Sequence, residues 1–300
     1  MQFDSRDDII QLTPLWEGER FPNGRPKVPT ELLRRIARLT TEEAWSGVWT
    51  KGYRYQFQTD FKVTHPGRLL VGRAVTAVMV PQRPDLHECL LQHGHENEGR
   101  KGYFNQWVID SLEEDDVVVV DMFDKVFQGT YVGGNLSTAI AARTKRGGAV
   151  IWGGVRDLQQ IEEIDNIQIF HRGNDPTGIG DVSMVGMNVP CRIGKAICMP
   201  GDVVLGTSSG VLFIPPHLAE SSAINGEKGY IRDLFGLGRV RNGIYSTAQI
   251  DAGWTVAIWE DFMDWFKNDA PKEYHHLTWD NELEGARKQA DKGHASDVRL

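Results

Sequence analysis

The chain has 300 residues, of which 40% are hydrophobic and 25% charged, a composition typical of a globular protein rather than a disordered one. Its formal net charge of −8, without a basic tract, argues against nucleic acid as a direct ligand. The N-terminus lacks a basic region followed by an apolar run, and no apolar stretch is long enough to span a bilayer. We therefore expect no signal peptide and no membrane association, and three cysteines without motif spacing predict reduced thiols in a cytoplasmic protein.

The first part of the chain predicts an arm followed by helices and a strand. Residues 1–28 are rich in Pro, Gly and charge and predict an irregular arm, which could lie across a neighbouring subunit. An apolar stripe after Thr30 predicts a helix that continues, or restarts at Thr41, through Trp45. Residues 74–80 then predict a strand.

Residues 81–100 collect several side chains that bind metals in other proteins. His87, Cys89, His93, His95 and Glu96 could together ligate zinc, but their spacing matches no standard zinc pattern. The segment is therefore predicted to be a polar loop near the mouth of a site.

The middle of the chain is organised around one glycine-punctuated stretch, residues 133–157. Before it, residues 104–112 predict a helix and residues 117–120 a buried strand. Within it, Gly133 and Gly134 allow a sharp turn, and Asn135 is placed to cap a helix over residues 136–146. A short buried strand over residues 149–152 follows, and Arg156 and Asp157 come at its end.

This arrangement suggests an anion site with a charged pair beside it. A glycine turn entering a helix leaves backbone N–H groups free, here those of Leu136 and Ser137, and such groups attract carboxylate or phosphate. The Arg156 guanidinium can grip a carboxylate with two hydrogen bonds, and the Asp157 carboxylate can hold Mg²⁺. The residues alone leave a second interpretation open, in which the pair is a surface or capping feature.

The rest of the chain predicts more strands and then an extension. A short helix is expected over residues 158–164, and His171, after a strand, is a candidate acid or base. Aromatic residues at helical spacing predict an amphipathic helix over residues 258–266, within a tail that packs on the core or on another subunit. The strands are expected over residues 167–170, 182–189, 192–198, 203–205 and 210–214.

Several motifs together resemble one family. An acidic residue, a gap of twenty residues and Arg-Asp form its signature, which here reads Asn135, twenty residues, Arg156 and Asp157. The segments VVVVD (117–121), GRAVTAV (72–78), PGDVVLG (200–206) and GVLFIPP (210–216) match as well. Over residues 30–220 the chain therefore resembles the family of the regulator of ribonuclease E activity A, which also contains 4-hydroxy-4-methyl-2-oxoglutarate aldolases.

The resemblance implies a fold, an assembly and a chemistry. It implies an α/β swivelling sandwich with mixed sheets, divided here into an arm (1–28), a family domain (29–220) and a C-terminal extension (221–300), in a homotrimer or hexamer. It implies a lyase that uses Mg²⁺, or another divalent cation such as Mn²⁺, on a 2-oxo or 2-hydroxy acid through a metal-stabilised enolate.

The resemblance also assigns roles to residues. Arg156 and Asp157 would be catalytic, with Asp157 the metal ligand, and Gly133, Gly134, Asn135, Leu136, Ser137 and Arg156 would bind the small carboxylic acid substrate. Asn135 departs from the acidic residue of the signature and loses its charge. Two alternatives therefore stay open: a hydro-lyase acting on a sugar acid or unsaturated uronate, and a regulator that binds proteins without catalysis.

Overall fold

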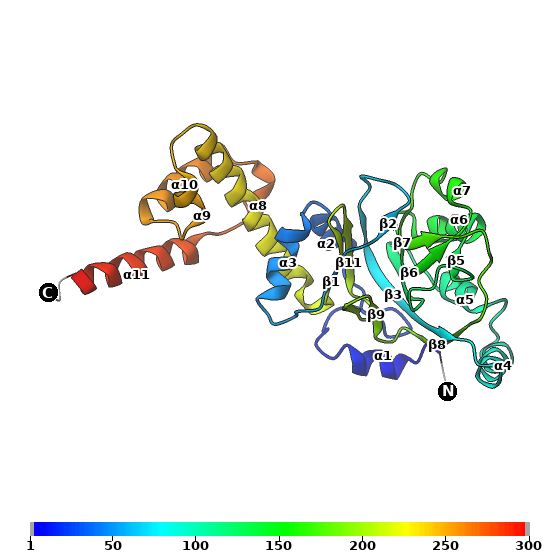
Figure 1. Cartoon of the computed structure of the whole chain (residues 1–300). Coiled ribbons are helices and arrows are strands. Elements are labelled where there is room, and N and C mark those ends of the chain that lie inside the picture. The colour runs from blue at the N-terminus through cyan, green and yellow to red at the C-terminus, as the bar shows by residue number, and fades with distance from the viewer. Residues whose placement is uncertain (1–2, 298–300) are drawn as a thin grey trace. The chain divides into compact units, whose positions relative to one another are not determined.

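The structure, a computed structural model, describes residues 3–297, with side chains up to residue 290 (Figure 1). The chain forms two compact units, one ending at Ala223 and the other beginning at Ile224. The first unit includes the segment predicted to be a separate arm. Each unit has its own buried core, so each is described by itself.

The first unit is built on a ten-stranded mixed sheet with the order β1-β12-β11-β3-β4-β6-β7-β2, in which β5 also pairs with β6 and β8 with β3. Strands β3, β4, β6 and β7 run parallel to one another. Residues 117–120 of β4 are fully buried, because both faces of a parallel sheet are covered. The strands are β1 (Phe57–Gln58), β2 (Lys62–Val63), β3 (Leu70–Pro81), β4 (Asp116–Asp121), β5 (Thr130–Val132), β6 (Gly148–Val155), β7 (Gln168–Asn174), β8 (Val182–Met187), β11 (Val203–Thr207) and β12 (Gly210–Ile214).

Helices cover the sheet of the first unit, with α5, α6 and α7 beside strands β4 to β7 (Figure 1). Helix α3 restarts after α2, as the sequence allowed, because Thr40 and Glu43 form a capping box with each other's backbone N–H groups. The mixed α/β fold with a large mixed sheet is thus confirmed. The helices are α1 (Arg6–Leu12), α2 (Thr30–Ile36), α3 (Thr41–Trp49), α4 (Pro84–Gln92), α5 (Phe104–Asp110), α6 (Gly134–Thr144) and α7 (Leu158–Glu162).

The segment 81–100 was predicted to be a loop, and that prediction was wrong. It forms helix α4 and a π-helix, η1 (His93–Asn97). Pro84 occupies the first turn of α4, where its missing N–H costs nothing. The His87 ring bonds the Ser183 hydroxyl at 2.9 Å, and within residues 3–290 no three potential ligands come close enough for a metal. The His93 ring lies 3.2 Å from the Glu98 carboxylate and the His95 ring 2.9 Å from the Gly102 carbonyl.

The predicted strand over residues 192–198 is in fact a hairpin of β9 (Cys191–Ile193) and β10 (Ala196–Cys198). Gly194 turns the chain between them with φ +59°, a left-handed conformation that glycine adopts without strain.

The N-terminal arm folds onto its own unit. Arg25 is 1% exposed and pairs with the fully buried Asp116. Its Nη1 donates to the Asp116 Oδ1 at 2.8 Å and its Nη2 to the Oδ2 at 2.6 Å. Phe3 packs edge-on against Trp107 in the core. The arm is thus held by a desolvated ion pair and apolar contacts, and it contains helix α1 rather than irregular chain alone.

The second unit is helical and has an aromatic core. Helix α8 (Ala219–Arg241) leads into it, followed by α9 (Thr247–Asp251), α10 (Val256–Asn268), η3 (Lys272–Tyr274) and α11 (Asp280–Asp297). The predicted amphipathic helix is α10, and Trp259, Phe262 and Phe266 of its stripe are buried. Among the described residues, no helix combines the length and the apolar character needed to cross a membrane.

Candidate active site

The Gly133 turn places the start of helix α6 beside the end of strand β6. Strands β5 and β6 run parallel, and the Arg156 N–H donates to the Val132 carbonyl at 3.0 Å. The ends of these two strands therefore lie side by side. Helix α6 begins at Gly134 with Gly133 as its N-cap. The prediction of Asn135 as the cap was therefore wrong: it lies in the first turn, with its side chain exposed.

The two glycines are needed for close approach rather than for a left-handed turn. A methyl group on Gly133 would overlap the Asp157 carboxylate, and one on Gly134 would overlap the Gln160 amide. Their absence lets Asp157 reach the helix start, where its Oδ2 accepts a hydrogen bond from the Gly134 N–H at 3.2 Å. The first amide of α6, that of Gly134, thus already binds a negatively charged side chain, that of Asp157.

The remaining amides of the first turn differ from the prediction. Ser137 is fully buried, and its N–H donates to the Gly133 carbonyl at 3.0 Å as the first bond of the helix. The Ser137 N–H, predicted to bind the substrate, is thus already used within the helix. The amides of Asn135 and Leu136 have no acceptor within the described part of the chain, as expected for a helix N-terminus.

Arg156 and Asp157 are both within reach of solvent. Their side chains are 44% and 33% exposed, and the Arg156 Nη1 lies 3.6 Å from the Asp157 Oδ2. Asp157 has φ +53°, in the left-handed region that aspartate and asparagine tolerate better than most residues. A pair this open and this long is a weak source of stability, so both groups remain free to engage a ligand.

A pocket of about 330 Å³ opens beside this turn. The Tyr103 hydroxyl donates to the Val182 carbonyl at 3.0 Å and the Asn105 amide to the Tyr131 carbonyl at 2.7 Å, so these wall residues are fixed. Asp157 is adjacent to the pocket but is not part of its wall. The lining residues are Tyr103, Asn105, Gln106, Asn135, Leu136, Arg156 and Ile179.

His171 proves to be structural. It is 1% exposed and its Nδ1 lies 2.9 Å from the Gly173 carbonyl. Burial lowers the pKa of His171, which keeps the ring neutral in the sheet. Its position inside β7 explains why it cannot serve as an acid or base for a ligand.

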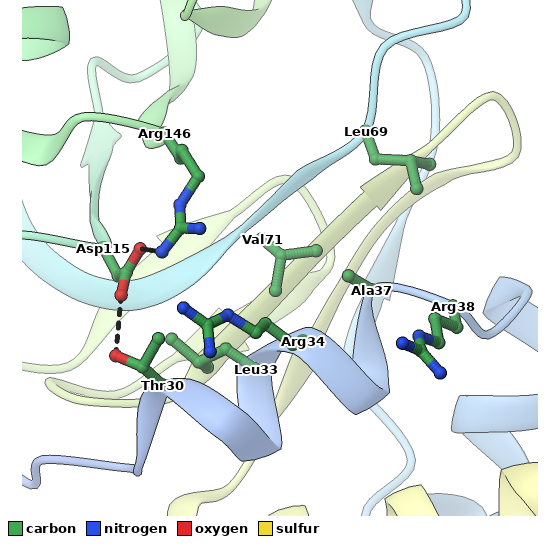
Figure 2. A pocket seen from close by; sticks show the side chains of 9 residues that line it. All are labelled: Thr30, Leu33, Arg34, Ala37, Arg38, Leu69, Val71, Asp115 and Arg146. Atoms are coloured by element: carbon green, nitrogen blue, oxygen red, sulfur yellow. Dashed lines mark hydrogen bonds and ion pairs between the residues drawn. The ribbon is translucent and has the colours of Figure 1, made fainter. Parts of the chain in front are cut away.

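A second, larger pocket also carries arginines, and Figure 2 shows it near helix α2. It has a volume of about 430 Å³ and an apolar floor that includes Leu33 and Val71. Its Arg146 pairs with the buried Asp115 at 3.0 Å, as Figure 2 shows. Its Arg34 pairs with Glu31 at 3.2 Å. We take the pocket beside Arg156 as the candidate site, because Asn135, Leu136 and Arg156, which the sequence predicted to bind a substrate, line it together.

A family model described as RraA-like (Aldolase/RraA) matches residues 43–213, more than half of the chain. The chain belongs to this family. Over 111 residues it is 30% identical to a provisionally named 4-hydroxy-4-methyl-2-oxoglutarate aldolase of Halalkalibacterium halodurans, covering 35% of this chain and 49% of the relative. The chain therefore spans about half the length of this curated relative.

Solved structures support the RraA-like fold. A Streptomyces coelicolor protein, described as an unusual member of the RNase ES inhibitor RraA protein family, aligns with a TM-score of 0.57 and 21% identity, over 70% of this chain and 95% of its own. An uncharacterised protein of Pseudomonas syringae pv. tomato aligns with a TM-score of 0.59 and 17% identity, over 76% and 100%. At these identities the likeness concerns the fold alone.

Four wall residues of the pocket were missed by the sequence analysis: Tyr103, Asn105, Gln106 and Ile179. Tyr103 directly precedes the helix predicted over residues 104–112, and Asn105 and Gln106 lie at its start, but no local pattern indicates that this helix faces α6. Only the parallel pairing of β4, β5 and β6 brings α5 and α6 together.

Proposed function

We propose that this RraA-like protein is a divalent-metal-dependent lyase acting on a small 2-oxo or 2-hydroxy acid. The observation that carries the proposal is the convergence of Arg156 with the open amides of Asn135 and Leu136 around one solvent-accessible pocket. The name of the Halalkalibacterium halodurans relative, an aldolase of an oxo acid, supports the same chemistry.

The substrate carboxylate would bind at the start of helix α6. There the Asn135 and Leu136 N–H groups can donate to one oxygen, and the Arg156 guanidinium can donate to the other. Asp157 already accepts from the Gly134 N–H, so its negative charge would keep the carboxylate on the Arg156 side. The apolar side chains of Leu136 and Ile179 leave room for a short carbon chain.

The residues fit a hydrated Mg²⁺ rather than a metal held by protein alone. The Asp157 Oδ2 bonds Gly134, while its Oδ1 has no hydrogen-bond partner among the described residues and is free to bind a cation. Mg²⁺ commonly keeps several waters and uses one or two carboxylates besides the substrate. The absence of a three-ligand cluster within residues 3–290 agrees with that mode. Bound there, a divalent cation would supply positive charge to polarise a 2-oxo group.

The chain's own residues would orient the substrate and hold charge. Arg156 and the helix amides fix the carboxylate end, so the reacting bond is held toward Asp157. The same positive groups favour the negative charge that develops when a bond next to the oxo group breaks. We further propose a homotrimer or hexamer, since exposed apolar side chains such as Phe127, which is 62% exposed, could be covered by another subunit.

The test is release of pyruvate from oxaloacetate and from a 4-hydroxy-2-oxo acid, with and without Mg²⁺, after subtraction of the rate without protein. We expect Mg²⁺-dependent release that falls at least about tenfold in Arg156→Ala, because a carboxylate clamp is lost. Arg34→Ala is the matched control, since Arg34 is also exposed, pocket-lining and paired with a nearby carboxylate. An equal loss in both variants, or no release at all, would contradict the proposal.

A further inference from the structure

A third cavity in the first unit lies far along the chain from the Gly133 turn. It has a volume of about 230 Å³, enough for roughly seven water molecules. Its walls come from residues 12–16 of the N-terminal arm, from residues 215–217, and from five single residues between them in the chain: Tyr53, Gln56, Ile197, Met199 and Asp202. Most of this lining is apolar, including Leu12, Trp16 and Ile197, which suits a small ligand with a hydrocarbon body.

Asp202 is the acidic residue that lines this cavity, and it has no basic partner among the described residues. The residue is 1% exposed. Its Oδ2 accepts a hydrogen bond from the Met199 N–H at 2.8 Å, whereas its Oδ1 is buried without a partner. A buried carboxylate oxygen without a partner loses its hydration and gains nothing in return.

Every other buried acid in the described part of the chain has a basic partner. Asp115 lies near Arg146 and Arg73, Asp116 bonds Arg25, and Asp121 has Arg192 at 3.7 Å. Glu227 of the second unit lies 3.3 Å from the ring of His276. Among the described residues no basic group pairs with Asp202 within 4 Å, and Asp202 lines a cavity of about 230 Å³ that has room for one.

The other polar groups of the cavity do not supply that partner. The Tyr53 hydroxyl and the His217 Nε2 bond each other at 3.0 Å. Burial lowers the pKa of His217, so its ring stays neutral near pH 7. The Gln56 amide donates to the Phe213 carbonyl at 2.9 Å. The cavity therefore has one acidic lining residue within a mostly apolar wall, and the second carboxylate oxygen of that residue is buried without a partner among the described residues.

We propose that this cavity binds a small apolar primary amine, whose ammonium group bonds the Asp202 carboxylate and whose hydrocarbon body packs against the arm. The ammonium supplies the cation and the hydrogen bond that Asp202 lacks. A neutral alcohol of the same shape would supply only the hydrogen bond, and a carboxylate would be repelled. The site is separate from the pocket beside Arg156, so it does not depend on the function proposed there.

Isothermal titration calorimetry of the full chain at pH 8 with cyclohexylamine, and with cyclohexanol of the same shape, tests the proposal. We expect saturable binding of the amine and at least about tenfold weaker binding of the alcohol, because a hydrogen bond to a charged group is stronger than one between neutral groups. Equal affinities for the two compounds, or no measurable binding of the amine, would overturn the proposal.

Two variants locate the site. Asp202→Asn keeps an oxygen for the Met199 N–H but removes the charge, so amine binding should weaken at least about tenfold. Asp121→Asn is the matched control, because Asp121 is also buried and also accepts a backbone N–H, from Phe123 at 2.8 Å. It should bind the amine like the unsubstituted protein. Loss of binding in the control but not in Asp202→Asn would refute the assignment.

Discussion

Replacing Asp202 by asparagine should change how the stability of the protein depends on pH. Burial raises the pKa of Asp202 from its ordinary value of 3.8 to about 7 in the folded protein, against one hydrogen bond from Met199 that lowers it. Between pH 4 and pH 7, Asp202 therefore keeps its proton in the folded state, whereas in the unfolded state it has already lost it. The free energy of unfolding contributed by Asp202 therefore falls as the pH rises from about 4 to about 7.

The size of the effect follows from the same two values. One pKa unit corresponds to 1.36 kcal/mol, so a rise from 3.8 to about 7 removes at most about 4 kcal/mol across that range. Asparagine has no proton to release, and it keeps an acceptor for the Met199 N–H. The difference in unfolding free energy, Asp202→Asn minus unsubstituted, should thus grow in favour of the variant as the pH rises.

Urea unfolding of both proteins at pH 4, 5.5 and 8 measures this difference directly, because the contributions of other groups cancel in it. Asp175→Asn provides the control, because hydrogen bonds from Thr177 lower the pKa of Asp175 below 3.8, so its titration lies at more acidic pH and its difference should stay nearly constant over this range. A difference that stays constant with pH for Asp202→Asn would refute the conclusion that this carboxyl is buried without a charged partner.

Other substitutions test further parts of the structure. Arg25→Met should lower the free energy of unfolding by about 3–5 kcal/mol in chemical denaturation, since it leaves Asp116 buried and unpaired apart from Arg73 at 3.8 Å. Ser137→Ala should change the melting temperature little, because the Ser137 hydroxyl is buried without a hydrogen-bond partner and contributes no bond that could be lost. Asn135→Asp should tighten Mg²⁺ binding in calorimetry by adding a negative charge in the exposed first turn of α6, and weaker binding would mean that Asn135 is not near the cation. Light scattering at micromolar concentration should give the mass of a trimer or hexamer, and a monomer would contradict that assembly.

The sequence allowed much of the fold to be predicted, because the signals were local. The valines of residues 117–120, the possible helix restart at Thr41 and the glycine turn at Gly133 each carry their own pattern, and each formed the expected type of element. The errors arose where tertiary contacts decide. The histidine-rich segment is helical where its turns pack on Trp107 and Ser183. Helix α8, which contains several glycines and charged residues, was not predicted.

The residues of the candidate site also fall into two groups, those that a local pattern could predict and those that depend on tertiary contacts. Arg156, Asn135 and Leu136 could be found from the signature spacing, and they do line one pocket. The burial of Ser137 and the bond from Gly134 to Asp157 depend on where the helix begins, and that differs by two residues from the predicted start. The α5 side of the pocket depends on strand order, which no stretch of sequence reveals by itself.

The central claim is that the turn between Gly133 and Asp157 binds a carboxylate together with a divalent cation, and oxalate binding tests it most directly. Oxalate resembles the planar anion of a 2-oxo acid, and calorimetry can follow its binding with and without Mg²⁺. We predict binding that requires Mg²⁺ and weakens at least about tenfold in Arg156→Ala and in Asp157→Asn, which preserves the left-handed backbone at that position. Binding in Arg34→Ala should be unchanged. Oxalate binding that ignores Mg²⁺, or that survives both substitutions, would contradict the account.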